Sequence, residues 1–380
     1  MNAAYIVDAV RTPVGTRRGG LAAIHPADLA AHVLREIVNR TGIDPAAVDD
    51  VIVGCVNAMG PQSGCIARTA WLSAGLPERV PAVTIDRQCG SSQQAIHFAA
   101  QAVLSGTQDL VVAAGVENMA IVPIDANTAV VERLGVGKYG SGWQERYGKQ
   151  EISQFRGAQL IAEKWGLSRE HLDRFSLESH RRAVQAIDEG RFDGQISALS
   201  GIVADEGPRR DTTAEKLANL APLREGWVVT AGGASQLSVG AAALLVASER
   251  AVQANKLTPL AQVRALAVTG DDPVLMLTGP IAATRAALDR AALDIEDVDL
   301  FEINEAFAPV VLAWAAETGA PMDRTNVNGG AIALGHPLGA TGAILATKLV
   351  YELHRTGGRY GLESMCEGGG QANATIFERL

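Results

Sequence analysis

Cys89 lies where a predicted strand gives way to a predicted helix. Residues 82–86 form a short apolar run, and a helical pattern begins near Ser91. A cysteine at a helix N-terminus is close to the positive end of the helix dipole and to free backbone N–H groups, which lower the thiol pKa and favour the thiolate. The position therefore predicts a nucleophile, although a buried structural role is the commoner fate of a lone cysteine.

His336 lies in a loop, residues 328–339, that contains four glycines and one proline. These residues fix an unusual backbone around one imidazole, which suits a histidine held in a site better than a core residue. A histidine near a thiol can take its proton or stabilise its thiolate. The other histidines lie mainly in helical or polar stretches, and we expect them at the surface or in packing.

Two further polar positions follow apolar strand-like runs. Asn304 ends such a run between Glu302 and Glu305, where buried polar groups need partners, so it belongs either to a structural network or to a site wall. Cys366 is followed by Glu367 and three glycines beginning at Gly368. Such a loop leaves backbone N–H groups free to receive an oxyanion.

The composition excludes several classes of protein. A net charge of −9 disfavours nucleic acid or an anionic membrane as the partner, because both repel an acidic protein at long range. No apolar run reaches the roughly 18 residues that predict a membrane span, and the N-terminus enters a strand-like run without a basic leader, so we expect a cytoplasmic protein. The four cysteines are too scattered for a disulfide framework and none forms a CxxC pair, so no metal site is predicted.

The first part of the chain alternates strand-like and helix-like patterns, which predicts a mostly parallel, layered α/β sheet. The predicted strands are residues 4–9, 50–56, 82–86 and 109–114, and the predicted helices are residues 26–41, 66–74 and 91–104.

The same pattern returns near the C-terminus. Residues 42–54 resemble residues 292–304 at an offset of 250, and Gly106 matches Gly357 at an offset of 251. A nearly constant offset predicts two copies of one α/β unit, with chance similarity between generic segments as the alternative.

An insertion separates the two copies. Residues 120–150 are glycine-rich and are predicted to be irregular, whereas residues 168–190 predict a helix that Ser168 caps and Gly190 ends. Insertions of this kind often carry substrate contacts. The predicted domains are an N-terminal half at residues 1–117, completed by residues 225–250, an inserted loop domain at 118–224, and a C-terminal half at 251–380.

Four short motifs together resemble the active-site loops of the thiolase family. They are Cys89-Gly90-Ser91, Asn304-Glu305-Ala306-Phe307, Gly335-His336-Pro337 and Cys366-Glu367-Gly368. The resemblance runs from Ala4 to Leu380. It implies an α/β thiolase fold with two duplicated α/β halves in an α-β-α-β-α arrangement and a loop domain inserted in the first half.

The resemblance also implies a division of labour. Cys89 attacks the 3-keto carbonyl of a 3-ketoacyl-CoA after His336 activates its thiol, and Cys366 protonates the departing carbanion and later deprotonates CoA. One implied oxyanion hole uses His336 and a water held by Asn304. The other uses the backbone N–H groups of Cys89 and Gly368. Coenzyme A is the implied co-substrate, and no tightly bound cofactor is expected.

Weaker similarities suggest where CoA and substrate bind. The segment that ends at Ser235 resembles the family segment near the CoA pantetheine, with Gly233 in place of an asparagine. Arg209 resembles an arginine that meets the CoA nucleotide, with a solvated surface loop as the alternative. Ala306 and Phe307 are expected to line the substrate site.

Departures from the family pattern concern the substrate. Short-chain enzymes often carry a His-Met-Gly segment at the acyl pocket, whereas this chain has Phe155-Arg156-Gly157. The whole pattern is most similar to thiolases of bacterial steroid-ring degradation. It predicts a branched or bulky 3-ketoacyl-CoA, for example a dicarboxylic ring fragment, with Arg156 either paired to the distal carboxylate or facing solvent.

Three alternatives stay open. The chain could be a biosynthetic acetoacetyl-CoA thiolase, or a non-catalytic acyl-CoA- or sterol-binding relative, although such a relative should lack Cys89 or His336. A 3-ketoacyl synthase is disfavoured by the second cysteine, Cys366. The family resemblance further implies a homodimer or homotetramer.

Overall fold

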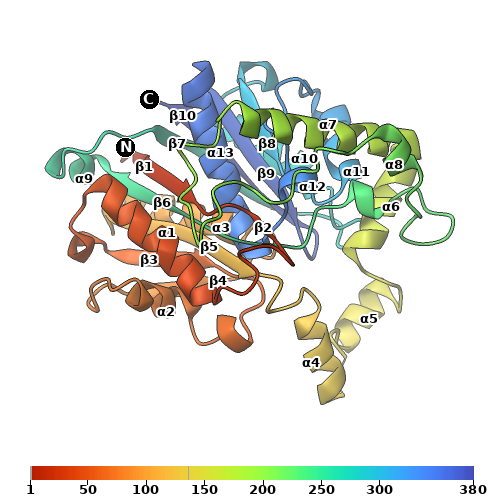
Figure 1. Cartoon of the computed structure of the whole chain (residues 1–380), viewed down its shortest axis with the longest axis horizontal. Helices are drawn as coiled ribbons and strands as arrows, with labels where there is room; N and C mark the ends of the chain where they lie inside the picture. The colour runs from red at the N-terminus through yellow and green to blue at the C-terminus, as the bar shows by residue number, and fades with distance from the viewer. Residues whose placement is uncertain (1, 136) are drawn as a thin grey trace.

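A computed structural model describes residues 2–135 and 137–380 and contains a ten-stranded sheet. Nine strands follow the order β4-β3-β5-β6-β1-β7-β10-β9-β8, and β2 pairs with β6. The two halves of the sheet meet at β1 and β7, where two residue pairs, Tyr5 with Gln262 and Ile6 with Ala261, join them. Helices lie on both sides of the sheet (Figure 1).

The first half is built from the N-terminal strands and helices, together with one strand that returns after the insertion. Its elements are β1 (Ala4–Arg11), β2 (Gly15–Thr16), α1 (Pro26–Thr41), β3 (Asp50–Gly54), α2 (Ile66–Ser73), β4 (Ala82–Ile85), α3 (Ser91–Ser105), β5 (Leu110–Asn118) and β6 (Ser238–Ser248), and α9 (Glu249–Ala254) leads to the second half.

The second half repeats this order. Its elements are β7 (Ala261–Gly270), α10 (Gly279–Ala291), β8 (Leu300–Ile303), α11 (Ala308–Thr318), α12 (Ala331–Leu334), α13 (Thr341–Thr356), β9 (Tyr360–Glu367) and β10 (Gln371–Arg379).

The predicted repeat is present in three dimensions. Asp49 accepts hydrogen bonds from the backbone N–H groups that open β5, and Asp299, 250 positions later, does the same for β9. α3 ends at Gly106 and α13 at Gly357, each with φ 77°, a left-handed conformation that glycine adopts without strain. The offset grows to 251 because α13 is 16 residues long and α3 is 15.

The prediction of a mostly parallel sheet is wrong. Only β4-β3-β5 and β8-β9 pair in parallel, and the other pairings along the sheet are antiparallel. The chain leaves β5 for the insertion and re-enters beside the same end, so β6 runs back along β5. A local strand pattern carries no information about this return.

The helices form three layers around the sheet halves. α1 and α2 cover the outer face of the first half, and α10 and α11 cover the outer face of the second. α3 and α13 lie together at the centre and bury the inner faces (Figure 1). A side chain at Gly342 of α13 would collide with the backbone of Gln93 in α3, so this glycine permits the close approach.

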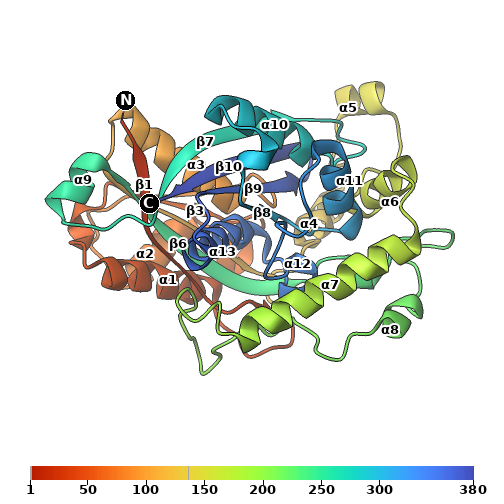
Figure 2. The same ribbon diagram turned by 90° about the horizontal axis from the view of Figure 1, so that it is seen from above.

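The insertion contains more helix than the sequence predicted. α4 (Ala126–Leu134) and α5 (Ser141–Tyr147) form within the predicted irregular segment and extend away from the rest of the molecule (Figure 1). α6 (Gln154–Lys164), α7 (Arg169–Asp188) and α8 (Ala214–Ala218) follow. The Ser168 hydroxyl accepts from His171 N and caps α7 as predicted, and α7 runs beside α12 (Figure 2).

Along the described residues, no helix is both long enough and apolar enough to cross a bilayer.

Candidate active site

Cys89 lies in a tight turn between β4 and α3. Gln88, directly before it, has φ 49°, a left-handed conformation that is strained for a residue with a side chain. The Asp86 carboxylate supports the turn by accepting from Gln88 N at 2.6 Å. The turn places the Cys89 thiol beside the loop that follows β9.

The Cys89 thiol is not activated by the helix dipole alone, contrary to the sequence prediction. Although part of the residue stays accessible, burial of the sulfur, together with the nearby Glu367 carboxyl group, raises the pKa of Cys89 to about 12. The backbone N–H groups of Cys89 and Gly368 act in the opposite direction by hydrogen bonding to the sulfur. The resting group is therefore a thiol, and a nucleophilic role requires a base.

His336 has the geometry of a neutral base. Thr341 Oγ1 donates to Pro337 O at 2.9 Å, so it accepts from His336 Nδ1–H at 2.6 Å. Nε2 is then the unprotonated nitrogen, and its one partner in the described chain is a long contact of 3.4 Å to Asn304 Nδ2. Burial lowers the pKa of His336 to about 4. The imidazole is thus uncharged at neutral pH and can receive a proton.

Asn304 lies next to this imidazole. Its Nδ2 is 3.4 Å from His336 Nε2, and its backbone N–H donates to Ser364 O at 3.0 Å. The Oδ1 atom is buried and has no hydrogen-bond partner within the described chain. Asn304 and His336, which lie 32 residues apart in the sequence, are therefore neighbours in the structure.

Cys366 lies near the end of β9 and is 1% exposed. Burial raises the pKa of its thiol well above the usual range, and the nearby Cys89 acts in the same direction, so the two thiols are neighbours. Cys366 packs in one apolar cluster with Ala306 and Phe307. These two residues are 4% and 3% exposed, so they form an apolar wall.

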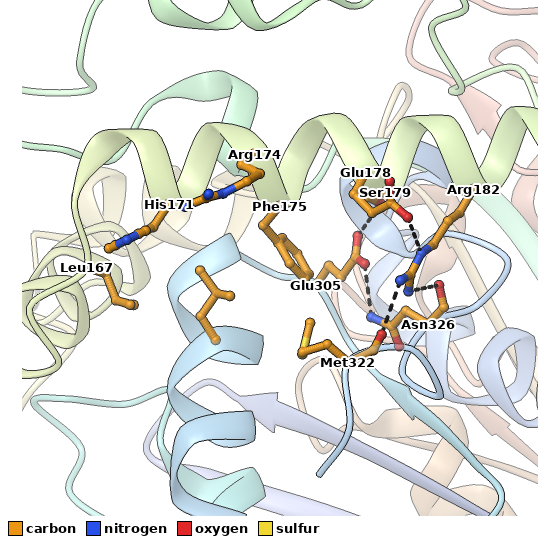
Figure 3. Close-up of a pocket in the computed structure, with 11 residues that line it drawn as sticks. Leu167, His171, Arg174, Phe175, Glu178, Ser179, Arg182, Glu305, Met322 and Asn326 are labelled. Atoms are coloured by element: carbon orange, nitrogen blue, oxygen red, sulfur yellow. Dashed lines mark hydrogen bonds and ion pairs between the residues drawn. The ribbon is translucent and has the colours of Figure 1, made fainter. Parts of the chain in front are cut away.

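The loop that carries Asn304 is held from behind by Glu305. Its carboxylate accepts from Ser179 Oγ of α7 at 2.6 Å and from Asn326 Nδ2 at 2.9 Å (Figure 3). It also accepts from Ile332 N at 3.2 Å. A cavity of about 430 Å³ between α7 and α11 opens beside it (Figure 3). Glu305 therefore ties the loop of Asn304 to the insertion and to the loop of His336.

The comparisons with known proteins cover the whole chain. The thiolase N-terminal domain matches residues 4–250, and the thiolase C-terminal domain matches residues 257–379. The chain belongs to the thiolase family. A thiolase is an acyltransferase that acts on CoA esters, so CoA is a substrate of this enzyme.

Similar thiolases differ in the substrates that their names specify. The chain is 58% identical to "Steroid 3-ketoacyl-CoA thiolase FadA6" of Mycobacterium tuberculosis, over 100% of this chain and 95% of that protein. It is 42% identical to "Beta-ketoadipyl-CoA thiolase" of Escherichia coli, over 100% of both chains. The crystal structure of the Bacillus anthracis acetyl-CoA acetyltransferase aligns with a TM-score of 0.89 at 37% identity, over 100% of this chain and 99% of that one.

Two cavities of this thiolase contain predicted substrate contacts. Arg209 and Ser235 line a cavity of about 690 Å³, together with Arg17 and Arg18, which the sequence reasoning missed. Their only signal in the sequence was a pair of adjacent basic residues. Gly368 lines a second cavity, of about 480 Å³.

Arg156 does not face either cavity. Its guanidinium donates to Gln150 Oε1 at 2.9 Å and to the Glu151 carbonyl. The structure therefore favours the alternative in which Arg156 makes no substrate contact. Phe155 of the same segment does line the second cavity and packs edge-on against Phe307, with 5.6 Å between ring centroids.

Glu367 lies among the candidate catalytic residues of this thiolase, and the sequence analysis assigned it no role. Neither buried carboxyl oxygen has a partner by hydrogen-bond geometry in the described chain. Burial raises the pKa of Glu367 to about 8, although the nearby Arg87 guanidinium and the Asn373 backbone act in the opposite direction. A side chain at Gly90 would collide with this carboxyl group. Its position between Cys366 and Gly368 was the available signal.

The thiolase site contains no metal-binding cluster among the described residues, since no three His, Cys, Asp or Glu side chains are placed to hold an ion.

Proposed function

We propose that this enzyme performs CoA-dependent cleavage of a 3-ketoacyl-CoA through an acyl group on Cys89. The observation that carries the proposal is the neutral His336 imidazole, fixed by Thr341 with Nε2 unprotonated and next to Asn304, together with the two neighbouring thiols of Cys89 and Cys366. Relatives named as 3-ketoacyl-CoA thiolases, at 40% to 58% identity, support it.

The first half-reaction begins with a proton transfer. His336 Nε2 removes the proton from Cys89 Sγ, and the thiolate attacks the 3-keto carbon. His336 and Asn304 stabilise the oxyanion that forms. The bond between C2 and C3 then breaks, and Cys366 donates its proton to the C2 carbanion of the departing acyl-CoA.

The second half-reaction restores the enzyme. The Cys366 thiolate takes the proton of an incoming CoA thiol, and the CoA sulfur attacks the acyl group on Cys89. The backbone N–H groups of Cys89 and Gly368 stabilise this second oxyanion. The oxyanion then collapses, the bond between the acyl group and Cys89 breaks, and His336 returns its proton to the Cys89 thiolate. Both thiols end protonated, which agrees with the raised pKa of each sulfur.

CoA binds, in this proposal, along the cavity that contains Arg209, Arg17, Arg18 and Ser235. The three guanidinium groups supply local positive charge in a chain of net charge −9, as a phosphorylated ligand requires. CoA is a co-substrate, and no tightly bound cofactor takes part.

The acyl chain is, we propose, bulky or branched and derives from steroid or lipid degradation. The steroid thiolase at 58% identity and the cavity of about 480 Å³ beside Gly368 support this substrate. The competing function, acetoacetyl-CoA thiolysis, is favoured by the likeness to acetyl-CoA acetyltransferase.

A comparison of kcat/KM for acetoacetyl-CoA and for a bulky 3-ketoacyl-CoA tests the choice. Filling an apolar pocket changes discrimination by roughly 10- to 200-fold, and we expect the bulky substrate to be preferred within that range. A clear preference for acetoacetyl-CoA contradicts the substrate proposal and leaves the reaction intact.

The remaining features are proposed on the same basis. We propose a homodimer or homotetramer that binds neither nucleic acid nor membranes and works in the cytoplasm, with α4 and α5 offering contact surface for a second copy. We also propose the four-part domain division that the sequence predicted. Sedimentation as a monomer at micromolar concentration contradicts the oligomer.

A further inference from the structure

The cavity beside Gly368 leads from the thiols toward the inserted domain. It starts at Gln88, Gly368 and Gly369, the loops on either side of Cys89. Ile124, Ile152, Phe155 and Met276 supply apolar walls. Lys138 and Tyr139 line the cavity from the segment between α4 and α5, and Trp143 lines it from α5. An acyl group on Cys89 can extend along this cavity.

Lys138 is the one cation among the described residues that line this cavity. Within the described chain it forms no ion pair or hydrogen bond. Its ammonium group lies 5.2 Å from the Tyr139 ring centroid, and that ring stacks on Trp143 at 4.5 Å. The aromatic pair thus holds a positive charge at the cavity with no protein anion bonded to it.

The charged groups nearby do not neutralise the Lys138 ammonium group. Arg156 is occupied by Gln150 and the Glu151 carbonyl, and Arg224 pairs with the Glu151 carboxylate at 2.8 Å. The one acidic residue of the lining, Asp125, lies at the N-terminus of α4, where the helix dipole offsets part of its charge.

We propose that Lys138 selects 3-ketoacyl-CoA substrates whose acyl chain carries a carboxylate at its far end. This inference rests on the proposed thiolase function and adds a substrate class to it. The apolar walls contact the carbon chain, and the ammonium group pairs with the distal carboxylate. Because Lys138 is exposed, solvent and salt screen the pair, so its effect is moderate and depends on ionic strength.

The test uses two 3-ketoacyl-CoA substrates of equal length, one ending in a carboxylate and one in its methyl ester. The measured quantity is the ratio of kcat/KM for the acid to kcat/KM for the ester. We expect Lys138→Met to lower this ratio about 3- to 10-fold, mainly through KM of the acid, because the contact lies far from the reacting carbon. Raised salt should lower the wild-type ratio and leave that of Lys138→Met unchanged.

Two matched variants control for nonspecific charge effects. Lys149→Met removes an exposed lysine that follows α5 and does not line the cavity. Arg156→Ala removes the guanidinium that already bonds to Gln150 and to the Glu151 carbonyl. Both should keep the wild-type ratio. An unchanged ratio in Lys138→Met, or an equal fall in Lys149→Met, overturns the proposal.

A binding measurement separates this inference from the proposed reaction. Calorimetry with the Cys89→Ser enzyme compares the affinities of saturated acyl-CoA analogues that end in a carboxylate or an ester. A preference for the acid that Lys138→Met removes supports the anion site even if neither substrate is cleaved. Equal affinities contradict it even if cleavage is rapid.

Discussion

Glu117 and Glu367 occupy equivalent positions in the two halves, 250 residues apart, and their surroundings differ completely. The Glu117 carboxylate accepts from Val56 N at 2.8 Å, Gln62 Nε2 at 2.7 Å and Gly339 N at 3.0 Å. Glu367 is equally buried, yet neither of its oxygens has a partner in the described chain. One copy therefore holds loops in place, and the other is a buried acid beside two thiols, with Arg87 as the nearby cation.

Other equivalent positions in the two halves also differ in the role of their side chains. Val116 of the first half corresponds to Cys366, so an apolar core residue in one copy is a buried thiol in the other. Ser91 corresponds to Thr341: the serine hydroxyl donates to Gln88 O in the turn before α3, whereas the threonine hydroxyl fixes the His336 imidazole. The duplicated scaffold thus provides matching sites, and the side chains decide which copy is structural and which is chemical.

The largest effect is expected when the first half's residue replaces Cys366. Cys366→Val should slow turnover by about 10²- to 10⁴-fold, because proton transfer to and from C2 and CoA is lost. Some acylation of Cys89 should still be detected in a single-turnover mass measurement, because His336 still activates the Cys89 thiol, but it should be slower because the C2 carbanion has lost its proton donor. Turnover close to wild type would remove Cys366 from the mechanism.

Glu367 should make stability fall as pH rises. Its pKa is raised from 4.5 to about 8 in the folded chain, so the unfolded chain loses its proton first and is favoured between these values. Relative to Glu367→Gln, the wild type should lose about 4 kcal/mol of unfolding free energy from pH 4.5 to 8, and the loss should level off above about pH 9. Parallel stability curves for the two proteins, from denaturant titrations across this range, would contradict a buried acid with a raised pKa.

Glu117→Gln should lower stability at every pH above neutrality, by about 2 kcal/mol, because the new amide N–H group faces backbone donors where the carboxylate accepted. Denaturant unfolding at pH 8 measures this. Equal stability in Glu117→Gln and wild type would remove the distinction between the two carboxyl groups.

Thr341→Val should reduce kcat by about 10-fold, because the imidazole loses the acceptor that fixes its tautomer. Thr341→Ser, which keeps the hydroxyl, should recover most of the activity. Ser91→Ala, the matched change in the other half, should leave the pH dependence of kcat unaltered. Failure of the serine variant to recover activity would indicate a packing role for Thr341.

Local sequence patterns predicted most of the fold and the principal candidate site residues. The offset between Ile43 and Leu293 predicted the repeat, and short motifs predicted that Cys89, Asn304, His336 and Cys366 would be brought together. Each of these signals is contained in a few consecutive residues.

Features that depend on distant segments were missed. The antiparallel β6 follows the long insertion, so no local pattern indicates its direction. The raised pKa of Cys89 comes from burial and from Glu367, which lies 278 positions away in the sequence, whereas the helix dipole was the only local effect. Thr341 was overlooked because its role exists only once the loop of His336 has folded.

The most direct test of the mechanism is to locate the acyl group. The enzyme is incubated with a 3-ketoacyl-CoA in the absence of free CoA, digested, and its peptides are mapped by mass. We predict the added acyl mass on the peptide that contains Cys89, with none on the peptide of Cys366, and its loss when CoA is supplied. Acylation of Cys366 with Cys89 unmodified would contradict the assigned division of labour.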